Sequence, residues 1–167
     1  MPDDASIDHL PLLIHGRTWE EMTPGFTFRT DARTITETDL INFVTLVGVF
    51  EPLFFDEKFG RDHGYKGRLC PGMMTFAYAE GLVIRSGSIH STGLAFVHTE
   101  LDIKAPVYVG DTITVVVEVT EQRQTSTGNR GMITTCNTVY NQHGDAVMIY
   151  SPKRLTKGRE QGTGESQ

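Results

Sequence analysis

Apolar residues recur at helical spacing in one early segment of the chain. The stripe consists of Leu40, Phe43, Val44 and Val47, at positions i, i+3, i+4 and i+7. Thr36 stands three residues before Asp39, the spacing at which a hydroxyl and a carboxylate satisfy free amides of a first helical turn. Gly48 follows where a helix would stop. The pattern predicts a helix over about residues 37–47.

A second segment, residues 73–85, is apolar on nearly every face and follows Pro71-Gly72. A helix that is hydrophobic all round is a buried helix, so we predict one here. Between the two helices, residues 49–68 show no clear period and contain several glycines. They predict a long loop with one helical turn around residues 56–59. Loops of this length inside compact domains are usually functional.

The rest of the chain alternates between apolar and polar residues. Residues 26–35 predict one strand before the first helix, and four more follow the second helix. These four runs span residues 94–103, 111–122, 132–140 and 146–150. The order of elements is therefore strand, helix, long loop, buried helix and four strands in a meander. We predict an α+β fold in which a single antiparallel sheet wraps around one buried helix.

The two ends of the chain differ from this middle part. Residues 1–16 are predicted to form an irregular N-terminal arm, and residues 17–155 a single domain. Residues 156–167 have no apolar anchor to offset the entropy of ordering, so they are predicted to be a flexible C-terminal tail.

Charge and composition exclude several classes of partner. The chain has 15 Lys and Arg against 21 Asp and Glu, a net charge of −6, so it has no basic surplus to neutralise a nucleic-acid backbone. No apolar stretch approaches the roughly 20 residues that cross a bilayer. The first residues are acidic where a signal peptide would be basic. We expect no nucleic-acid or membrane partner and a cytoplasmic location.

Cysteine and histidine spacing gives little support for a metal or cofactor site. Cys70 and Cys136 stand far apart with no CxxC partner, so we expect reduced, buried thiols. The histidines show no paired spacing such as HxxxH. Because no dinucleotide or P-loop pattern occurs either, we expect neither a metal nor a cofactor.

Three local motifs carry a resemblance to a known family. They are residues 33–43 (RTITETDLINF), residues 67–74 (GRLCPGMM) and residues 106–112 (PVYVGDT). Through them the chain resembles the MaoC-like, or (R)-specific enoyl-CoA hydratase, family over most of residues 17–155. The resemblance implies the hotdog fold, with an acyl thioester, carried by CoA or by acyl carrier protein, as the substrate.

The hydration signature of that family is altered in this chain. The family has a Gly-Asp-x-Asn-Pro-x-His segment, in which the Asp and His activate a water. Here residues 48–54 read GVFEPLF, so Val49 takes the Asp position, Glu51 the Asn position and Phe54 the His position. Neither a valine nor a phenylalanine side chain transfers a proton. The usual hydratase mechanism therefore cannot run on these two residues.

The same resemblance implies that this chain keeps the part of the site that binds the thioester. The family's amide at the helix entry, matching Gly72, binds the thioester carbonyl, and a helix N-terminus supplies free N–H groups there. Alternatively, Pro71-Gly72 merely starts a helix well. The predicted substrate-binding residues are Val49, Phe54, Pro71, Gly72 and Met73.

Two nearby residues are candidates to replace the lost acid and base. Glu51 is a lone carboxylate next to the altered centre, and His63 stands on the loop that leads back to the second helix. A loop Glu or His is more often solvated or locally hydrogen-bonded, and that alternative stays open. Asp56 and Glu57 are expected to cap the short helical turn.

The sequence supports two main hypotheses on function. The first is an acyl-thioester hydratase or dehydratase that adds water reversibly to a 2-enoyl-CoA with Glu51 and His63 as a non-standard acid and base. The second is a catalytically degenerate, acyl-thioester-binding subunit of a heteromeric hotdog dehydratase. A thioesterase that uses Glu80 is a third possibility. The resemblance implies dimers whose sheets join edge to edge, which also removes an open edge strand. We therefore expect a homodimer under the first hypothesis and a heterodimer under the second.

Overall fold

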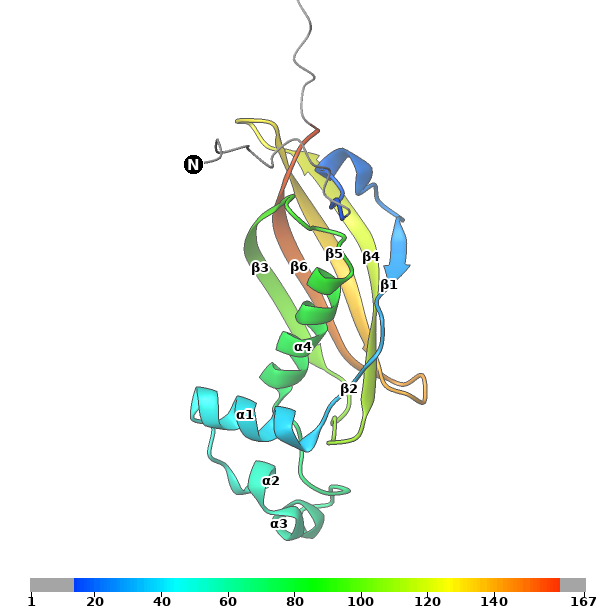
Figure 1. The fold of residues 1–167 in the computed structure, drawn as a ribbon. Helices are drawn as coiled ribbons and strands as arrows, with labels where there is room; N and C mark the ends of the chain where they lie inside the picture. The colour runs from blue at the N-terminus through cyan, green and yellow to red at the C-terminus, as the bar shows by residue number, and fades with distance from the viewer. Residues whose placement is uncertain (1–13, 160–167) are drawn as a thin grey trace, which may run out of the picture.

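The computed structural model describes residues 14–159, and it has the expected α+β architecture. One antiparallel sheet of six strands is ordered β1-β4-β5-β6-β3, with β2 paired to β4. The strands are β1 (Thr27–Arg29), β2 (Arg33–Thr34), β3 (Gly93–Ile103), β4 (Thr112–Gln124), β5 (Arg130–Tyr140) and β6 (Ala146–Lys157). Figure 1 shows the helix α4 (Gly72–Arg85) lying along one face of this sheet, with three shorter helices near its N-terminal end.

The first of these helices, α1 (Glu37–Val47), begins and ends where the sequence predicts. The Thr36 hydroxyl accepts the Asp39 N–H at 3.2 Å, and the Asp39 carboxylate accepts the Thr36 N–H at 2.8 Å. Gly48 ends the helix in the left-handed conformation, with φ of 75°. Of the predicted apolar stripe, Leu40 and Val44 are fully buried and Phe43 packs against the core, whereas Val47 in the last turn is 49% exposed.

The segment between α1 and α4 is more ordered than the single predicted turn. It contains α2 (Pro52–Phe55) and α3 (Glu57–Asp62). Pro52 is the first residue of α2, where its missing N–H costs no hydrogen bond. Asp56 accepts the Phe59 N–H and so caps α3 as expected, whereas Glu57 forms an ion pair with Arg61.

The long helix α4 is buried on the face that meets the sheet and open on the other. Its buried residues are Met74, Thr75, Ala79, Leu82 and Val83. On the opposite side Met73 is 63% exposed and Ile84 is 56% exposed. The helix was predicted to be buried on all sides, but in the single chain only the face that packs on the sheet is buried, and the second apolar face is exposed.

The main core lies between α1, α4 and the sheet. Alternate residues of β4 and β5 point into this core, among them Val115, Val117 and Val139. Strand β6 extends through Lys157 and buries Thr156, so the sheet continues two residues beyond the predicted boundary at residue 155. Strand β3 forms one edge and is mostly exposed.

Parts of the predicted arm and tail lie outside the described residues, namely 1–13 and 160–167. Within the described part of the arm, the Gly16 N–H donates to the His90 carbonyl at 2.9 Å. Across residues 14–159, none of the helices combines the length and the apolar character that crossing a membrane requires.

Candidate functional site

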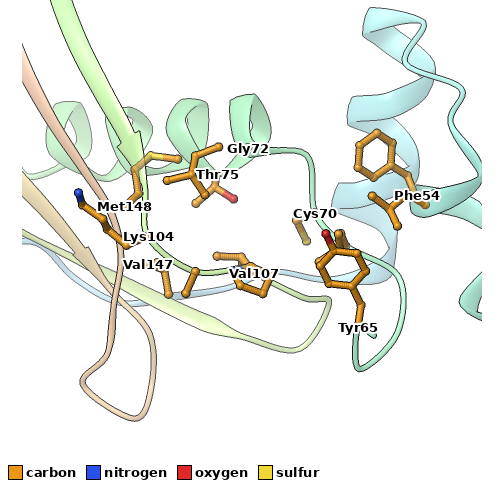
Figure 2. Close-up of a pocket in the computed structure, with 14 residues that line it drawn as sticks. Phe54, Tyr65, Cys70, Gly72, Thr75, Lys104, Val107, Val147 and Met148 are labelled. Carbon is orange, nitrogen blue, oxygen red and sulfur yellow. The ribbon is translucent and has the colours of Figure 1, made fainter. Parts of the chain in front are cut away.

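A cavity of about 400 Å³ opens beside the N-terminus of α4. Its walls come from α2 and the segment that follows α3, the start of α4, the connection from β3 to β4, and β6 (Figure 2). The lining residues are Leu53, Phe54, Tyr65, Leu69, Cys70, Gly72, Thr75, Ile103, Lys104, Ala105, Pro106, Val107, Val147 and Met148. Most of these side chains are apolar, so the cavity suits an apolar ligand with few polar groups.

Backbone hydrogen bonds hold these walls together. The Cys70 N–H donates to the Val107 carbonyl at 2.8 Å, and the Leu69 N–H donates to the Leu53 carbonyl at 3.2 Å. The segment that enters α4 is thus tied both to α2 and to the strand connection. Chain segments far apart in sequence therefore enclose the cavity.

The first turn of α4 presents free N–H groups at the cavity. The Met74 and Thr75 N–H groups donate to the Pro71 carbonyl, which leaves those of Gly72 and Met73 without an acceptor inside the helix. Gly72 lines the cavity, and a Cβ at this position would overlap Cδ1 of Ile103. A side chain at residue 72 would therefore require the exposed Ile103 side chain to move.

Four polar side chains reach the cavity: Tyr65, Cys70, Thr75 and Lys104. In Figure 2 the Thr75 hydroxyl projects from α4 into the space in front of Val107. Burial, together with the charges of Asp111, Asp39 and Glu37, raises the pKa of the Cys70 thiol to about 12. Cys70 is therefore a neutral thiol near pH 7, and it is not a thiolate nucleophile.

Neither a histidine nor a carboxylate is among the residues that line this cavity within the described chain. Likewise, across residues 14–159 there is no cluster of three or more His, Cys, Asp or Glu that could hold a metal ion. The cavity therefore offers hydrogen-bond donors and an apolar surface, but neither of the side-chain types, histidine and carboxylate, that activate water in the family's signature.

Two of the five predicted substrate-binding residues line the cavity, namely Phe54 and Gly72. Val49 follows α1, where its N–H donates to the Val44 carbonyl, and it does not line the cavity. Pro71 is the buried residue that precedes α4, and the Met73 side chain lies on the open face of that helix. The substrate-binding role of these residues stays a prediction.

The two predicted acid–base residues lie beside the cavity wall and outside its lining. Glu51 is exposed at the start of α2, where its carbonyl accepts the Phe54 N–H. His63 ends α3, where its ring stacks on Phe59 with the centroids 4.2 Å apart. Its Nδ1 lies 2.8 Å from the Phe59 carbonyl oxygen, so the imidazole is engaged with its own helix. The catalytic role of both residues stays a prediction.

Four polar lining residues were not predicted as site residues from the sequence: Tyr65, Cys70, Thr75 and Lys104. Thr75 carried a usable signal, because it is a hydroxyl within an otherwise apolar helix. Tyr65 is two residues beyond His63, and only the direction in which the loop turns decides which of the two side chains lines the cavity. Lys104 carries no local signal, since it is an ordinary cation at the end of an edge strand.

Comparison with known proteins gives one family and several relatives. The model of the family described as FAS1-like, dehydratase domain region, matches residues 22–150. The chain is 25% identical over 119 residues to the mitochondrial 3-hydroxyacyl-acyl-carrier-protein dehydratase of Arabidopsis thaliana, a match that covers 71% of this chain and 68% of that protein. It is 30% identical over 89 residues to the (R)-specific enoyl-CoA hydratase of Rhodospirillum rubrum, which covers 53% of this chain and 60% of that protein.

Solved structures share the fold over most of the chain. A monoamine oxidase regulatory protein from Archaeoglobus fulgius is 27% identical with a TM-score of 0.79, covering 87% of this chain and 97% of that one. The HadBC (3R-hydroxyacyl-ACP dehydratase) complex from Mycobacterium tuberculosis has a TM-score of 0.68 at 20% identity, covering 79% of this chain and 96% of that one. At this identity the second likeness concerns the fold alone.

Proposed function

Because the chain belongs to the FAS1-like dehydratase-region family of MaoC-like hotdog proteins, we propose that it binds an acyl thioester as the catalytically incomplete subunit of a hydratase or dehydratase. The reaction of the assembly is the reversible addition of water to a 2-enoyl thioester. The observation that carries this proposal is the composition of the cavity. It keeps free N–H groups at the start of α4 but has an apolar lining without histidine or carboxylate among the described residues.

The chemistry of water addition explains why this lining matters. A base must take a proton from the water, and an acid must return one to the carbon next to the thioester carbonyl. Phe54 lines the cavity at the position where the resemblance places the family's histidine, and its ring transfers no proton. By contrast, the Gly72 N–H at the helix N-terminus remains suited to a thioester carbonyl. Under this proposal the chain retains a group that binds the thioester but lacks the histidine and carboxylate that would transfer the protons.

An open apolar surface supports pairing with a second subunit. It comprises the uncovered side of α4 and the edge strand β3, with exposed residues Met73, Ile84, Leu94, Phe96, Val97 and Ile103. A long, apolar edge strand is a ready template for pairing with another chain. Under this proposal the partner is another hotdog subunit that carries an intact acid–base pair. The HadBC complex, which shares the fold, is named as a complex of such a dehydratase.

The experiment measures binding and turnover separately on the purified chain. Calorimetry with 2-enoyl-CoA and with the matching acyl-carrier-protein thioester should detect binding and identify the preferred carrier. Turnover is followed as loss of the absorbance of the conjugated thioester. This absorbance should stay constant with the chain alone and should fall when the co-purified hotdog partner is present. Failure to bind either thioester, or full turnover by the chain alone, would contradict the proposal.

The second candidate function is a self-sufficient hydratase that uses Glu51 and His63. The observation in its favour is that both residues stand two positions before residues that line the cavity: Glu51 before Leu53, and His63 before Tyr65. If the purified chain hydrates enoyl thioesters, Glu51→Gln and His63→Gln should each lower kcat by at least about 100-fold. The exposed Glu57 on the same segment provides the matched control, because Glu57→Gln should leave kcat unchanged. Equal kcat in all variants would reject this candidate.

A further inference from the structure

The Thr75 hydroxyl lies at the cavity and makes no hydrogen bond to any of residues 14–159. Thr75 is only 2% exposed, and its hydroxyl faces the cavity (Figure 2). A threonine inside a helix often donates its hydroxyl to the carbonyl four residues earlier. Here the Pro71 carbonyl accepts the backbone N–H of Thr75 at 3.1 Å, and the hydroxyl makes no bond to any residue that the structure describes.

The surroundings of this hydroxyl are apolar. The nearby lining includes Cys70, Val107, Val147 and Met148, all of which belong to the main core. The hydroxyl oxygen itself is open to the cavity, so a ligand bound there can reach it. At this position a threonine presents a hydroxyl where a valine would present only methyl groups, so it is suited to a polar group that a ligand brings.

The spacing along α4 indicates where on a bound thioester this group would lie. Gly72 and Thr75 both line the cavity and are three residues apart, a rise of about 4.5 Å along the helix. Helical side chains lean toward the N-terminus, so the Thr75 hydroxyl lies back toward the level of Gly72. When the thioester carbonyl accepts the Gly72 N–H, the third carbon of the acyl chain is only two bonds from the carbonyl carbon. An oxygen on that carbon comes within reach of Thr75.

We propose that the Thr75 hydroxyl binds the oxygen at the third carbon of a 3-hydroxyacyl thioester, an inference that rests on the thioester binding proposed above. Thr75 then determines specificity, because the cavity favours a 3-hydroxyacyl chain over the saturated chain of equal length. A site built to hydrogen-bond a substrate hydroxyl discriminates against the analogue that lacks it, since its own polar group is then left unpaired.

The test compares the binding of two thioesters that differ by one oxygen, 3-hydroxybutyryl-CoA and butyryl-CoA. In calorimetry the natural chain should bind the hydroxylated thioester about tenfold more tightly, the range expected for one hydrogen bond. Thr75→Val should reduce this ratio to about one while retaining the binding of butyryl-CoA. Thr75→Ser restores a hydroxyl and should restore the ratio. Thr138→Val, on the outer face of β5, serves as the matched control and should leave the ratio unchanged.

The possible results separate this inference from the function on which it rests. If the natural chain binds neither thioester, both the proposed function and the role of Thr75 are overturned. If it binds both with equal affinity, or if Thr75→Val keeps the tenfold ratio, thioester binding stands and the role of Thr75 is overturned. The melting temperatures of the variants should match that of the natural chain within a few degrees, and Thr75→Ser covers the case in which the valine variant fails to fold.

Discussion

The Glu80 carboxylate of α4 and the Arg154 guanidinium of β6 form a buried ion pair that joins the helix to the sheet. Arg154 Nη2 lies 2.6 Å and 2.5 Å from the two carboxylate oxygens. The side chains of Arg154 and Glu80 are 7% and 12% exposed. Both carboxylate oxygens are engaged, and Glu80 does not line the cavity beside Gly72. Its position therefore argues for a structural role rather than for the thioesterase chemistry considered from the sequence.

Breaking this pair on one side should destabilise the fold. Arg154→Met leaves a buried carboxylate without a partner and should lower the free energy of unfolding by about 3 kcal/mol. The double variant Glu80→Met/Arg154→Met should lose less than Arg154→Met alone, because no unpaired charge remains. Urea unfolding of the single and double variants measures both effects. Glu57→Gln, which removes an exposed ion pair with Arg61, is the control and should cost less than about 1 kcal/mol. An equal cost for Arg154→Met and Glu57→Gln would contradict this prediction.

The cap of α1 should make stability depend on pH in the acid range. Burial acts to raise the pKa of Asp39, but hydrogen bonds from Thr36 and Tyr78 and the charge of Arg33 outweigh it, so the pKa lies below the ordinary value of 3.8. A carboxyl with a lowered pKa adds stability above its unfolded pKa and loses it as the pH falls through its folded pKa. Asp39→Asn should therefore cost about 1 kcal/mol at pH 7, and this difference should shrink below about pH 4. Chemical denaturation at pH 7, 5, 4 and 3 tests it, and a difference that grows toward acid pH would contradict it.

The buried thiol in the cavity should react slowly and report on ligand binding. Because the pKa of Cys70 is raised to about 12, its thiolate fraction at pH 8 is about 1 in 10,000. In a Cys136→Ser background, alkylation of Cys70 by iodoacetamide at pH 8 should be at least about 100-fold slower than that of free cysteine. The rate should rise steadily up to about pH 11. A bound acyl thioester should slow it further, since Cys70 lines the cavity. Labelling at the rate of free cysteine would disprove both the burial and the raised pKa.

Restoring the altered hydration signature should restore chemistry. If Val49 and Phe54 are what prevents water addition, Val49→Asp/Phe54→His should gain hydratase turnover over the natural chain by about 100-fold or more. Phe54 already lines the cavity, so an imidazole there would face the ligand. The control Val49→Asn/Phe54→Gln is similar in size and polarity but cannot exchange protons, and it should stay inactive. Thioester binding without any gain in turnover would show that the loss of activity has another cause.

The open face of α4 should control assembly. If the proposed subunit pairing uses this exposed apolar face, Met73→Glu/Ile84→Glu places two charges on it and should abolish the pairing, as measured by light scattering after gel filtration. The stability of each chain should change little, because neither side chain is buried in the single chain. Thr127→Glu, exposed in the turn between β4 and β5, is the control and should leave the assembly intact. A dimer that survives the double substitution would place its interface elsewhere.

Local spacing predicted much of the fold. The helix α1 begins after Thr36 and ends before Gly48 because its caps join residues no more than a few positions apart. Most strands followed from alternation. The single strand predicted over residues 26–35 is instead two short strands, β1 and β2, which pair with different parts of β4. Strand β6 runs through Lys157 because its last residues pair with β3 and β5, which alternation alone does not indicate. The second and third helices were underestimated, since a short helix offers too few turns to display a period.

The candidate site was predicted less completely than the fold. Phe54 and Gly72 were expected at the cavity and line it, because the motif that includes them also sets the start of α4. Tyr65 replaces the expected His63 at the wall, since the ring of His63 stacks on its own helix. The direction of a loop side chain depends on the packing of the segments around it, which no local pattern reports.

By itself, the sequence determined the order of the elements, most of their boundaries and the resemblance to a family, because period, caps and motifs are properties of neighbouring residues. Only the tertiary structure decided that the Thr75 hydroxyl faces an apolar cavity and that Glu80 meets Arg154, 74 positions away. It also decided that one face of α4 stays open. Each of these features depends on contacts between distant segments, and such contacts form only when the sheet folds against the helix.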